Sequence, residues 1–331
     1  SARWPAMPAN LTPQYQEAED AYKAALTNDE RLAALEDMLA YIPKHKGTEK
    51  MQADIKKRLS KLRAEIIEER GRKGGKVDPY RVQKEGAAQA FVIGPVNSGK
   101  SSIVGWLTNA KVAIADYPFS TTVPVSGMMQ YEDIKMQLVD TPPIIMEDPV
   151  SSLFSNARLC DVLMIVLDAS DQSSVYVLDA LSELLKSRKT LVDSTDASGA
   201  GITRGRLLVV ANKMDLEPSR ENLSTMRELL PDYKYLACSA LSGEGMPDIP
   251  AAVFELSGIV RVYAKPPGGR LERKDPFVVK RGATVEDVAG VIHKQLQHSF
   301  KNARLWGSSR YSGQSVPRGY LVSDGDIIEF S

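Results

Sequence analysis

The sequence predicts an α/β protein built from three parts, and three observations carry this prediction. Apolar positions recur at helical spacing between residues 28 and 70. From about residue 86, short apolar runs alternate with helical stretches, which is typical of a parallel sheet covered by helices. Glycine-containing linkers follow both regions. We therefore expect a helical hairpin in residues 1–76, a doubly wound sheet in 77–262 and a small α+β unit in 263–331.

The N-terminal part is predicted to be an antiparallel pair of helices. One helix would bury Leu32, Leu35, Leu39 and Ile42, and the next would bury Met51, Ile55, Leu59, Leu62 and Ile66. Pro43 and Gly47 interrupt the pattern, because proline cannot continue a helix and glycine disfavours one. Thr48 stands where its hydroxyl can cap the second helix. The basic, glycine-rich segment RGRKGGK at 70–76 is typical of a flexible tether.

The central part contains five apolar runs that predict strands buried on both faces of a sheet. They are AFVIG at 90–94, MQLVD at 136–140, VLMIVLD at 162–168, LLVVAN at 207–212 and YLACSA at 235–240. Ligands of open α/β sheets bind beyond the carboxyl ends of the strands, so the polar residues that follow these runs form the candidate site. The polar stretch 193–205 is expected to be a surface loop.

The C-terminal part, which follows PPGG at 266–269, mixes strand and helix signals. Its strand-like runs are FVVK at 277–280, ARLW at 303–306, GYLV at 319–322 and DIIEF at 326–330, and a helical stretch covers 285–296. This combination predicts a small mixed α+β domain.

Charge is unevenly distributed along a chain that is neutral as a whole, with 42 basic and 42 acidic side chains in 331 residues. The net charge is −4 over residues 1–40, +7 over 41–76, −8 over 77–260 and +5 over 261–331. Two basic flanks favour contact with a polyanion, and solvated basic faces without a partner are the alternative. The second helix carries Lys56, Lys57, Arg58, Lys61 and Arg63.

The composition also predicts the compartment. Two cysteines, Cys160 and Cys238, are too few and too far apart for a disulfide framework, which favours the reducing cytoplasm. No apolar run reaches the roughly 18 to 20 residues of a membrane span, and the N-terminus lacks the pattern of a signal peptide. We expect a cytoplasmic protein with no membrane partner.

The most specific motif is GPVNSGKS at 94–101, which lies between a predicted strand and a helical stretch. It fits G-x-x-x-x-G-K-[ST], the phosphate-binding P-loop, in the context that this motif requires. Glycines let consecutive N–H groups turn towards phosphate oxygens, Lys100 would reach the β- and γ-phosphates, and Ser101 would bind Mg²⁺. The expected nucleotide contacts in this loop are Gly94, Asn97, Ser98, Gly99, Lys100, Ser101 and Ser102.

A second motif, NKMD at 212–215, follows a later strand and predicts the base that is bound. The carboxylate of Asp215 can accept two hydrogen bonds from the N1–H and N2–H₂ groups of guanine, which adenine cannot offer. Asn212 would brace the loop or contact the base edge, and the stem of Lys213 could cover the base plane. Ser239 and Ala240 are expected to add backbone donors to the guanine oxygen. An ATP-dependent kinase is therefore disfavoured.

The magnesium site is predicted from two further positions. Asp140 ends a strand and fits the carboxylate that orients Mg²⁺ through Ser101 or water. The segment ADYPFSTTVPVSG at 115–127 lies where a magnesium-binding switch threonine belongs, and Thr121 is the first choice, with Thr122 second.

Together these motifs resemble the Obg-like GTPases, and in particular the developmentally regulated GTP-binding proteins. The resemblance rests on the P-loop, NKMD and ADYPFST, on IPKHKGTEK of the helical hairpin, and on DPFVVKRGATVEDVAGVIHK, ARLWGSS and DGDIIEF near the C-terminus. It implies that the last part is a TGS domain, a ubiquitin-like β-grasp found in proteins that act on ribosomes or RNA. Alignment with the family's YPFTT assigns the magnesium ligand to Thr121.

The chain departs from that family in two ways. The family has a small domain inserted before its NKxD motif, but Asp140 and Asn212 leave room only for a plain GTPase domain. The family's D-x-x-G motif reads DTPP here, with Pro143 in place of the glycine and Ile144 where Ras-like enzymes hold the glutamine that positions water. By the same resemblance, Asn97 stands where some related GTPases bind K⁺, although turn geometry explains an asparagine there equally well.

We therefore expect a GTP/GDP-binding switch with weak intrinsic GTPase activity that contacts the ribosome or RNA through the TGS domain and the basic hairpin. Lys100 and Thr121 are the expected catalytic residues. A scaffold that binds GTP or GDP without hydrolysis is the alternative. The sequence predicts no oligomeric state.

Overall fold

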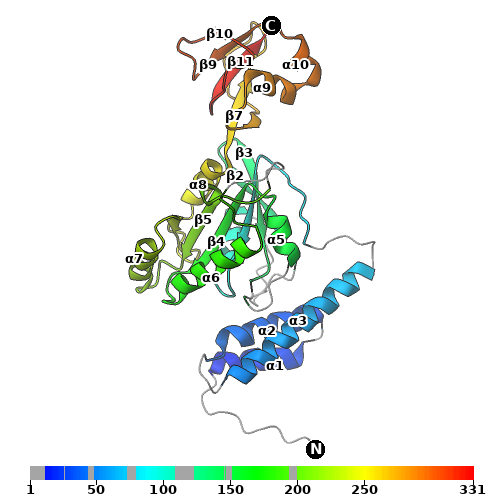
Figure 1. Cartoon of the computed structure of the whole chain (residues 1–331), viewed down its shortest axis with the longest axis vertical. Coiled ribbons are helices and arrows are strands. Elements are labelled where there is room, and N and C mark those ends of the chain that lie inside the picture. The colour runs from blue at the N-terminus through cyan, green and yellow to red at the C-terminus, as the bar shows by residue number, and fades with distance from the viewer. Residues whose placement is uncertain are drawn as a thin grey trace, which may run out of the picture.

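The computed structural model of the chain has three parts arranged in a row (Figure 1). A bundle of helices lies at the N-terminal end, a sheet flanked by helices lies in the middle, and a smaller sheet with two helices lies at the C-terminal end. The structure describes residues 12–25, 27–43, 48–72, 80–108, 123–144, 146, 151–193 and 200–331.

The described residues of the N-terminal part form three helices, α1 (Pro13–Ala24), α2 (Asn28–Tyr41) and α3 (Glu49–Arg72). The predicted pair corresponds to α2 and α3, and α1 packs beside α2. Helix α1 begins where the Thr12 hydroxyl accepts a hydrogen bond from the Tyr15 amide, and α2 begins with a capping box between Thr27 and Glu30. Helix α3 runs into the segment that was expected to be a tether.

One basic residue of α3 lies inside this bundle rather than on its surface. Arg63 donates to the Glu36 carboxylate of α2 at 2.8 Å, and the two side chains are only 7% and 1% exposed. A buried pair of this kind fixes how two helices pack, because either partner alone would leave a charge without compensation. The expectation that Arg63 contributes to a polyanion-binding face is therefore wrong.

Within the described ranges, the central sheet has six strands in the order β2-β3-β1-β4-β5-β6. The strands are β1 (Gln89–Ile93), β2 (Val125–Tyr131), β3 (Ile134–Asp140), β4 (Val162–Asp168), β5 (Leu207–Asn212) and β6 (Lys234–Ala237). All neighbours run parallel except β2, which pairs with β3 as an antiparallel hairpin at the edge. The carboxyl ends of β1, β3, β4, β5 and β6 therefore meet at one edge of the sheet, as the doubly wound prediction requires.

Helices cover both faces of this sheet. They are α4 (Lys100–Thr108), α5 (Ser151–Ala157), α6 (Ser174–Ser187), α7 (Ser219–Leu229) and α8 (Asp248–Ser257). Residues of β1 alternate between the two cores: Phe91 packs with α5, α6 and α7, whereas Val92 packs with α4 and α8. The stretch expected to be a surface loop is partly buried, because Ile202 is fully buried and forms a bridge with Leu191. The short 3-10 helix η1 (Arg204–Arg206) follows it.

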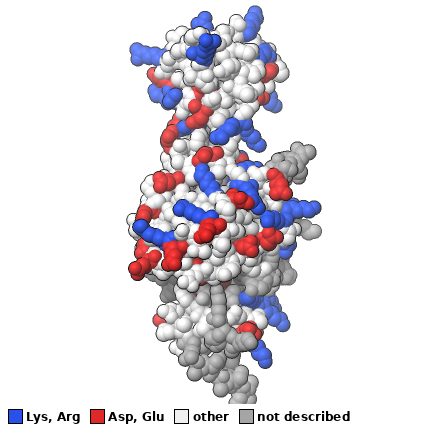
Figure 2. All heavy atoms as spheres, turned by 60° about the vertical axis from the view of Figure 1, so that its left-hand side comes forward, with Lys and Arg blue, Asp and Glu red and all other residues white. Residues whose placement is uncertain are grey.

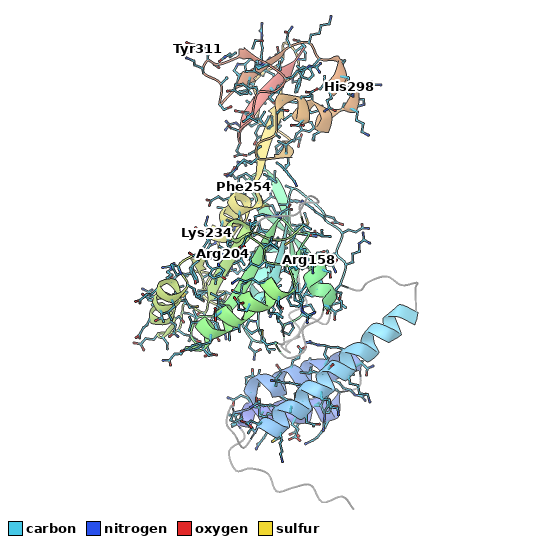
Figure 3. All side chains as sticks on the ribbon, viewed as in Figure 1. Arg158, Arg204, Lys234, Phe254, His298 and Tyr311 are labelled. Carbon is cyan, nitrogen blue, oxygen red and sulfur yellow. The ribbon has the colours of Figure 1, made fainter. Side chains whose placement is uncertain are left out.

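The C-terminal sheet has five strands in the order β10-β9-β11-β7-β8. Its elements are β7 (Ile259–Ala264), β8 (Phe277–Lys280), α9 (Val285–Ile292), α10 (Lys294–Ser299), β9 (Ala303–Trp306), β10 (Gln314–Val316) and β11 (Asp326–Phe330). The division expected at residue 262 falls inside β7. GYLV at 319–322 is not a strand; only Leu321 forms a bridge, to Thr284. Phe254 of α8, labelled in Figure 3, lies near the junction of the two sheets.

Candidate functional site

The P-loop residues have the backbone geometry that the motif predicts. Gly94 has φ +154°, and a Cβ atom there would lie 2.3 Å from the carbonyl oxygen of Val166 in β4. Gly99 has φ +91°, and its Cβ would lie 2.1 Å from the side-chain nitrogen of Asn212. Both positions therefore require glycine, because L-residues rarely adopt these angles and neighbouring strands approach too closely. Asn97 also has a positive φ of 58°, and its side chain is exposed.

Lys100 begins helix α4 and is 6% exposed. Its Nζ donates to the carbonyl oxygen of Pro95 at 2.7 Å, within the loop that it is expected to help close around phosphate. Burial lowers the pKa of Lys100 to about 8, although the nearby Asp140 charge acts in the opposite direction. A bound phosphate group would place negative charge next to this buried lysine and stabilise its ammonium form. Ser102, in the same turn of α4, is exposed.

The predicted magnesium residues Ser101 and Asp140 lie next to each other. The Ser101 hydroxyl donates to Asp140 Oδ2 at 2.6 Å, although the two residues are 39 positions apart. The P-loop follows β1 and Asp140 ends β3, and these parallel neighbours place Val92 opposite Asp140. A hydroxyl and a carboxylate are oxygen ligands of the kind that Mg²⁺ prefers, so the residues fit this ion. The predicted third ligand, Thr121, and its alternative, Thr122, lie outside the described residues.

The NKMD loop is joined directly to the P-loop. The Asn212 side chain donates to the Ser98 carbonyl at 2.9 Å and accepts from the Ala240 amide at 3.0 Å, and Asn212 is only 2% exposed. Of the two roles considered for Asn212, the structure favours bracing the loops over contact with the base edge. Three loops that follow β1, β5 and β6 are thereby held in one arrangement.

Asp215 lies at the exposed end of this loop and accepts a hydrogen bond from the Ser239 hydroxyl. The backbone amides that were expected to meet the guanine oxygen have other acceptors. Ser239 N–H donates to the Glu244 carbonyl at 2.9 Å, and Ala240 N–H donates to Asn212. In this structure, Ser239 therefore orients Asp215 through its hydroxyl, and Ala240 supports Asn212.

Lys213 forms an ion pair that was not predicted from the sequence. Its Nζ lies 2.6 Å from Asp168 Oδ2, at the end of β4. Asp168 ends the predicted strand VLMIVLD, so its position at the carboxyl edge was visible in the sequence. Its partner was not, because the pairing depends on β4 and β5 being neighbours with Asp168 opposite Asn212.

The DTPP segment after β3 is packed against the P-loop. Pro143 is buried, and the next amide, that of Ile144, donates to the Gly94 carbonyl at 3.0 Å. The Ile144 side chain is 8% exposed and belongs to the core beneath the sheet. The amide that follows Pro143 therefore already has an acceptor, and Ile144 points into the core rather than towards a water molecule.

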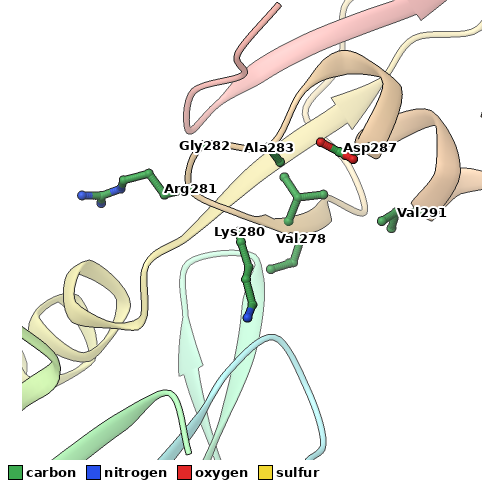
Figure 4. Close-up of a pocket in the computed structure, with 8 residues that line it drawn as sticks. Val278, Lys280, Arg281, Gly282, Ala283, Asp287 and Val291 are labelled. Carbon is green, nitrogen blue, oxygen red and sulfur yellow. The ribbon is translucent and has the colours of Figure 1, made fainter. Parts of the chain in front are cut away.

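The described residues were also examined for other kinds of site. Within the ranges that the structure describes, no cluster of three His, Cys, Asp or Glu side chains could hold a metal ion. No helix in those ranges combines the length and apolar character needed to cross a membrane. A hollow in the C-terminal part lies beside β8 and α9, and the residues that line it include Val278, Lys280, Arg281 and Val291 (Figure 4).

Comparison with known families finds two matches. A family model described as 50S ribosome-binding GTPase matches residues 89–198, and one described as TGS domain matches residues 260–331. The first match contains the P-loop and Asp140 but ends before NKMD, and the second covers the part that was expected to be a β-grasp.

Known proteins are similar over most of the chain. An uncharacterized GTP-binding protein of Methanocaldococcus jannaschii is 28% identical over 91% of this chain and 92% of its own length. GTP-binding protein 1 of Schizosaccharomyces pombe is 25% identical, over 90% and 98%. Developmentally-regulated GTP-binding protein 1 of Xenopus laevis is 26% identical, over 90% and 97%. The stated resemblance is thus confirmed: the chain carries a GTPase domain followed by a TGS domain.

These alignments also bear on the expected absence of an inserted domain. The alignment with the archaeal protein extends over 367 positions, more than the 331 residues of this chain, so that relative has residues without a counterpart here. Between Asp140 and Asn212 the described residues form only α5, β4, α6, η1 and β5.

Proposed function

We propose that this protein is a guanine-nucleotide-binding switch with slow GTPase activity that acts with the ribosome or another RNA. The observation that carries the proposal is the hydrogen bond from Asn212 to the Ser98 carbonyl at 2.9 Å. It joins the loop expected to recognise guanine to the loop expected to hold phosphates, beside the contact between Ser101 and Asp140. One edge of the sheet thus brings together the phosphate loop, two of the expected magnesium residues and the loop expected to bind guanine, which supports the proposal.

The residues divide the work between base and phosphates. Asp215 would accept the two guanine donors, the P-loop amides and Lys100 would bind the phosphates, and Ser101, Asp140 and Thr121 would hold Mg²⁺. When bound, Mg²⁺ supplies positive charge that stabilises negative charge on the phosphates. Hydrolysis would be transfer of the γ-phosphoryl group to water. Lys100 and the loop amides would stabilise the charge that develops, with no protein base.

A second candidate function, a GTP- or GDP-bound scaffold without hydrolysis, is favoured by the DTPP segment. Ile144 is a core residue and cannot orient water, and Pro143 has no N–H. Single-turnover hydrolysis of radiolabelled GTP, with and without ribosomes, separates the two candidates. We expect slow hydrolysis that ribosomes accelerate, and none in Lys100→Ala. Bound GTP that stays intact under both conditions would favour the scaffold, and competition by ATP would contradict guanine recognition.

The proposed polyanion contact involves both basic flanks. Lys57 and Arg58 are exposed on α3, and Lys and Arg side chains are spread over the C-terminal part at the top of Figure 2. The description of the matched GTPase family names the 50S ribosome. The family resemblance described above also implies that the TGS domain acts on ribosomes or RNA. We place this activity in the cytoplasm, since Cys160 and Cys238 are both buried, free thiols.

Co-sedimentation with ribosomes tests this contact. We expect affinity to fall steeply between about 50 and 200 mM salt, because basic residues displace counterions from phosphates. Lys57→Glu should weaken binding and reduce the salt dependence. Asp20→Lys on α1 is the control for a general charge effect, since Asp20 is exposed and lies on a different helix. Binding that does not respond to salt, or no binding, would remove the RNA part of the proposal.

A further inference from the structure

The carboxylate of Asp168 is held in a fixed orientation at the end of β4. Its Oδ2 accepts a hydrogen bond from Lys213 Nζ at 2.6 Å. Its Oδ1 accepts from the Ser170 backbone amide at 3.0 Å and from the Ser170 hydroxyl at 2.6 Å. Both oxygens therefore have partners, and the turn after β4 orients the carboxylate towards the neighbouring loop.

Lys213 is held at its backbone as well as at its tip. It has φ +67°, an angle that a lysine rarely adopts. Its carbonyl accepts from the Leu216 amide at 3.1 Å and from the Ser219 hydroxyl at 2.7 Å, which stabilises the unusual conformation. A lysine side chain normally samples many rotamers. Here the backbone and the ammonium group are both held, so the methylene chain joins the NKMD loop to the end of β4.

The position of this chain suggests what it does. Asp215 lies two residues beyond Lys213 in the same loop, and the methylene groups of an extended lysine can cover an aromatic ring. The pair is partly exposed, with 33% of the Lys213 side chain and 25% of the Asp168 side chain accessible, so a ligand can reach it. Pairing also neutralises a carboxylate that would otherwise repel an anionic nucleotide.

We propose that Asp168 is a positioning residue for guanine recognition: it anchors the Lys213 ammonium so that the lysine stem forms one wall of the base site. The inference rests on the proposed role of NKMD in binding guanine. Asp168 would not touch the nucleotide itself. It would lower the entropy that Lys213 loses when the base binds, which is a gain in pre-organisation.

Asp168→Asn tests this role, because asparagine keeps an oxygen for Ser170 but loses the negative charge that attracts Lys213. Affinities for GDP and GTP are measured by displacement of a fluorescent guanine nucleotide. We expect both to weaken by the same factor, roughly tenfold, since the γ-phosphate is not involved and one charge-assisted hydrogen bond is lost. The melting temperature without nucleotide should stay unchanged, and Asp168→Glu should restore part of the affinity.

A double-variant cycle shows whether Asp168 acts through Lys213. Lys213→Met keeps the stem but removes the ammonium, so it should weaken binding about as much as Asp168→Asn, and the combination should be no weaker than either alone. Asp232→Asn, which breaks a surface pair with Arg204 in the same domain, is the matched control and should have no effect.

Three results would overturn the proposal: wild-type affinity in Asp168→Asn, a loss confined to GTP, or losses that multiply in the double variant. These are distinct from failure of the proposed function. If the wild-type protein bound neither GDP nor GTP, the assignment of NKMD itself would be wrong.

Discussion

Pro143 removes a backbone donor at the position where GTPases of this type hold glycine. That glycine N–H donates to the γ-phosphate, and the adjacent Ile144 amide already donates to Gly94 here. Loss of one charge-assisted hydrogen bond costs about 1.5 to 3 kcal/mol. We therefore expect the wild-type protein to bind GTP and GDP with similar affinity and Pro143→Gly to favour GTP roughly tenfold, as measured by titration of both nucleotides.

The neighbouring proline provides the control for this change. Pro142→Gly loosens the same segment without changing the residue that aligns with the glycine. It should leave the GTP to GDP ratio unchanged. Strong preference for GTP in the wild type, unaffected by Pro143→Gly, would show that another donor serves the γ-phosphate.

Asn97 is the residue for which a ligand role and a turn role can be separated by substitution. Its φ of 58° is one that asparagine tolerates better than most residues, which supports the turn role. If Asn97 also holds K⁺ near the phosphates, GTP hydrolysis should be faster in potassium than in sodium buffer. Asn97→Gly keeps the backbone angle and removes the side-chain oxygen, so it should abolish that difference. Equal rates in the two salts, or a potassium response retained in Asn97→Gly, would exclude K⁺ binding by this side chain.

At the scale of elements, helix α2 contains a carboxyl group, that of Asp37, whose ionised form is destabilised by its surroundings. Burial, and then the nearby Glu36 charge, raise the pKa of Asp37 to about 6 from its ordinary value of 3.8. The folded state therefore holds this proton more tightly than the unfolded state. The contribution of Asp37 protonation to the free energy of unfolding is complete below about pH 4, and it is lost as the pH rises through 6.

Asp37→Asn should accordingly stabilise the protein at pH 8 but not at pH 4. At pH 8 we expect the free energy of unfolding, measured with urea, to rise by about 1 kcal/mol after allowance for screening by solvent. Asp20→Asn is the control, because Asp20 is an exposed carboxylate of α1. An equal effect of Asp37→Asn at both pH values would contradict a raised pKa.

The elements that could be predicted best from the sequence are those whose side chains are nearly all buried. Strands β4 and β5 were predicted with their observed bounds, because they are buried on both faces and are apolar up to their last residues, Asp168 and Asn212. Strand β2 was missed because it is an edge strand in which Ser126 and Gln130 are exposed. Helix α1 was missed because Tyr15 and Ala18 are its only buried residues, too few for a clear helical period.

The contacts of the candidate site also divide into those that could be predicted from the sequence and those that could not. The P-loop is contiguous in sequence, so its residues could be named, and the contact between Ser101 and Asp140 followed from the motif order. The ion pair between Asp168 and Lys213 could not be predicted, since it depends on the register of two strands. Likewise, the Asn212 contact with Ser98 joins residues 114 positions apart.

At the scale of the whole molecule, Arg261 of β7 joins the C-terminal part to the central one. Its guanidinium donates to Asp324 beside β11 and to Glu132 and Asp133 at the turn between β2 and β3. It also lies over the ring of Phe254, at 4.9 Å from the ring centre. Because β3 ends at Asp140 of the candidate site, the same hairpin contacts both the C-terminal part and the predicted magnesium position.

We therefore expect the central and C-terminal parts to unfold together in the wild type and to unfold separately in Arg261→Met. The Arg261 side chain is 9% exposed, but its carboxylate partners are 32% to 59% exposed. We expect the free energy of unfolding of Arg261→Met to be lower by about 2 kcal/mol, a value between those for exposed and buried ion pairs. Calorimetry should show the C-terminal part melting first in the variant. Arg204→Met, which breaks an exposed pair within the central part, should leave the transition single. One unchanged transition in Arg261→Met would mean that apolar contacts, such as those of Val278 with the central core, hold the parts together without it.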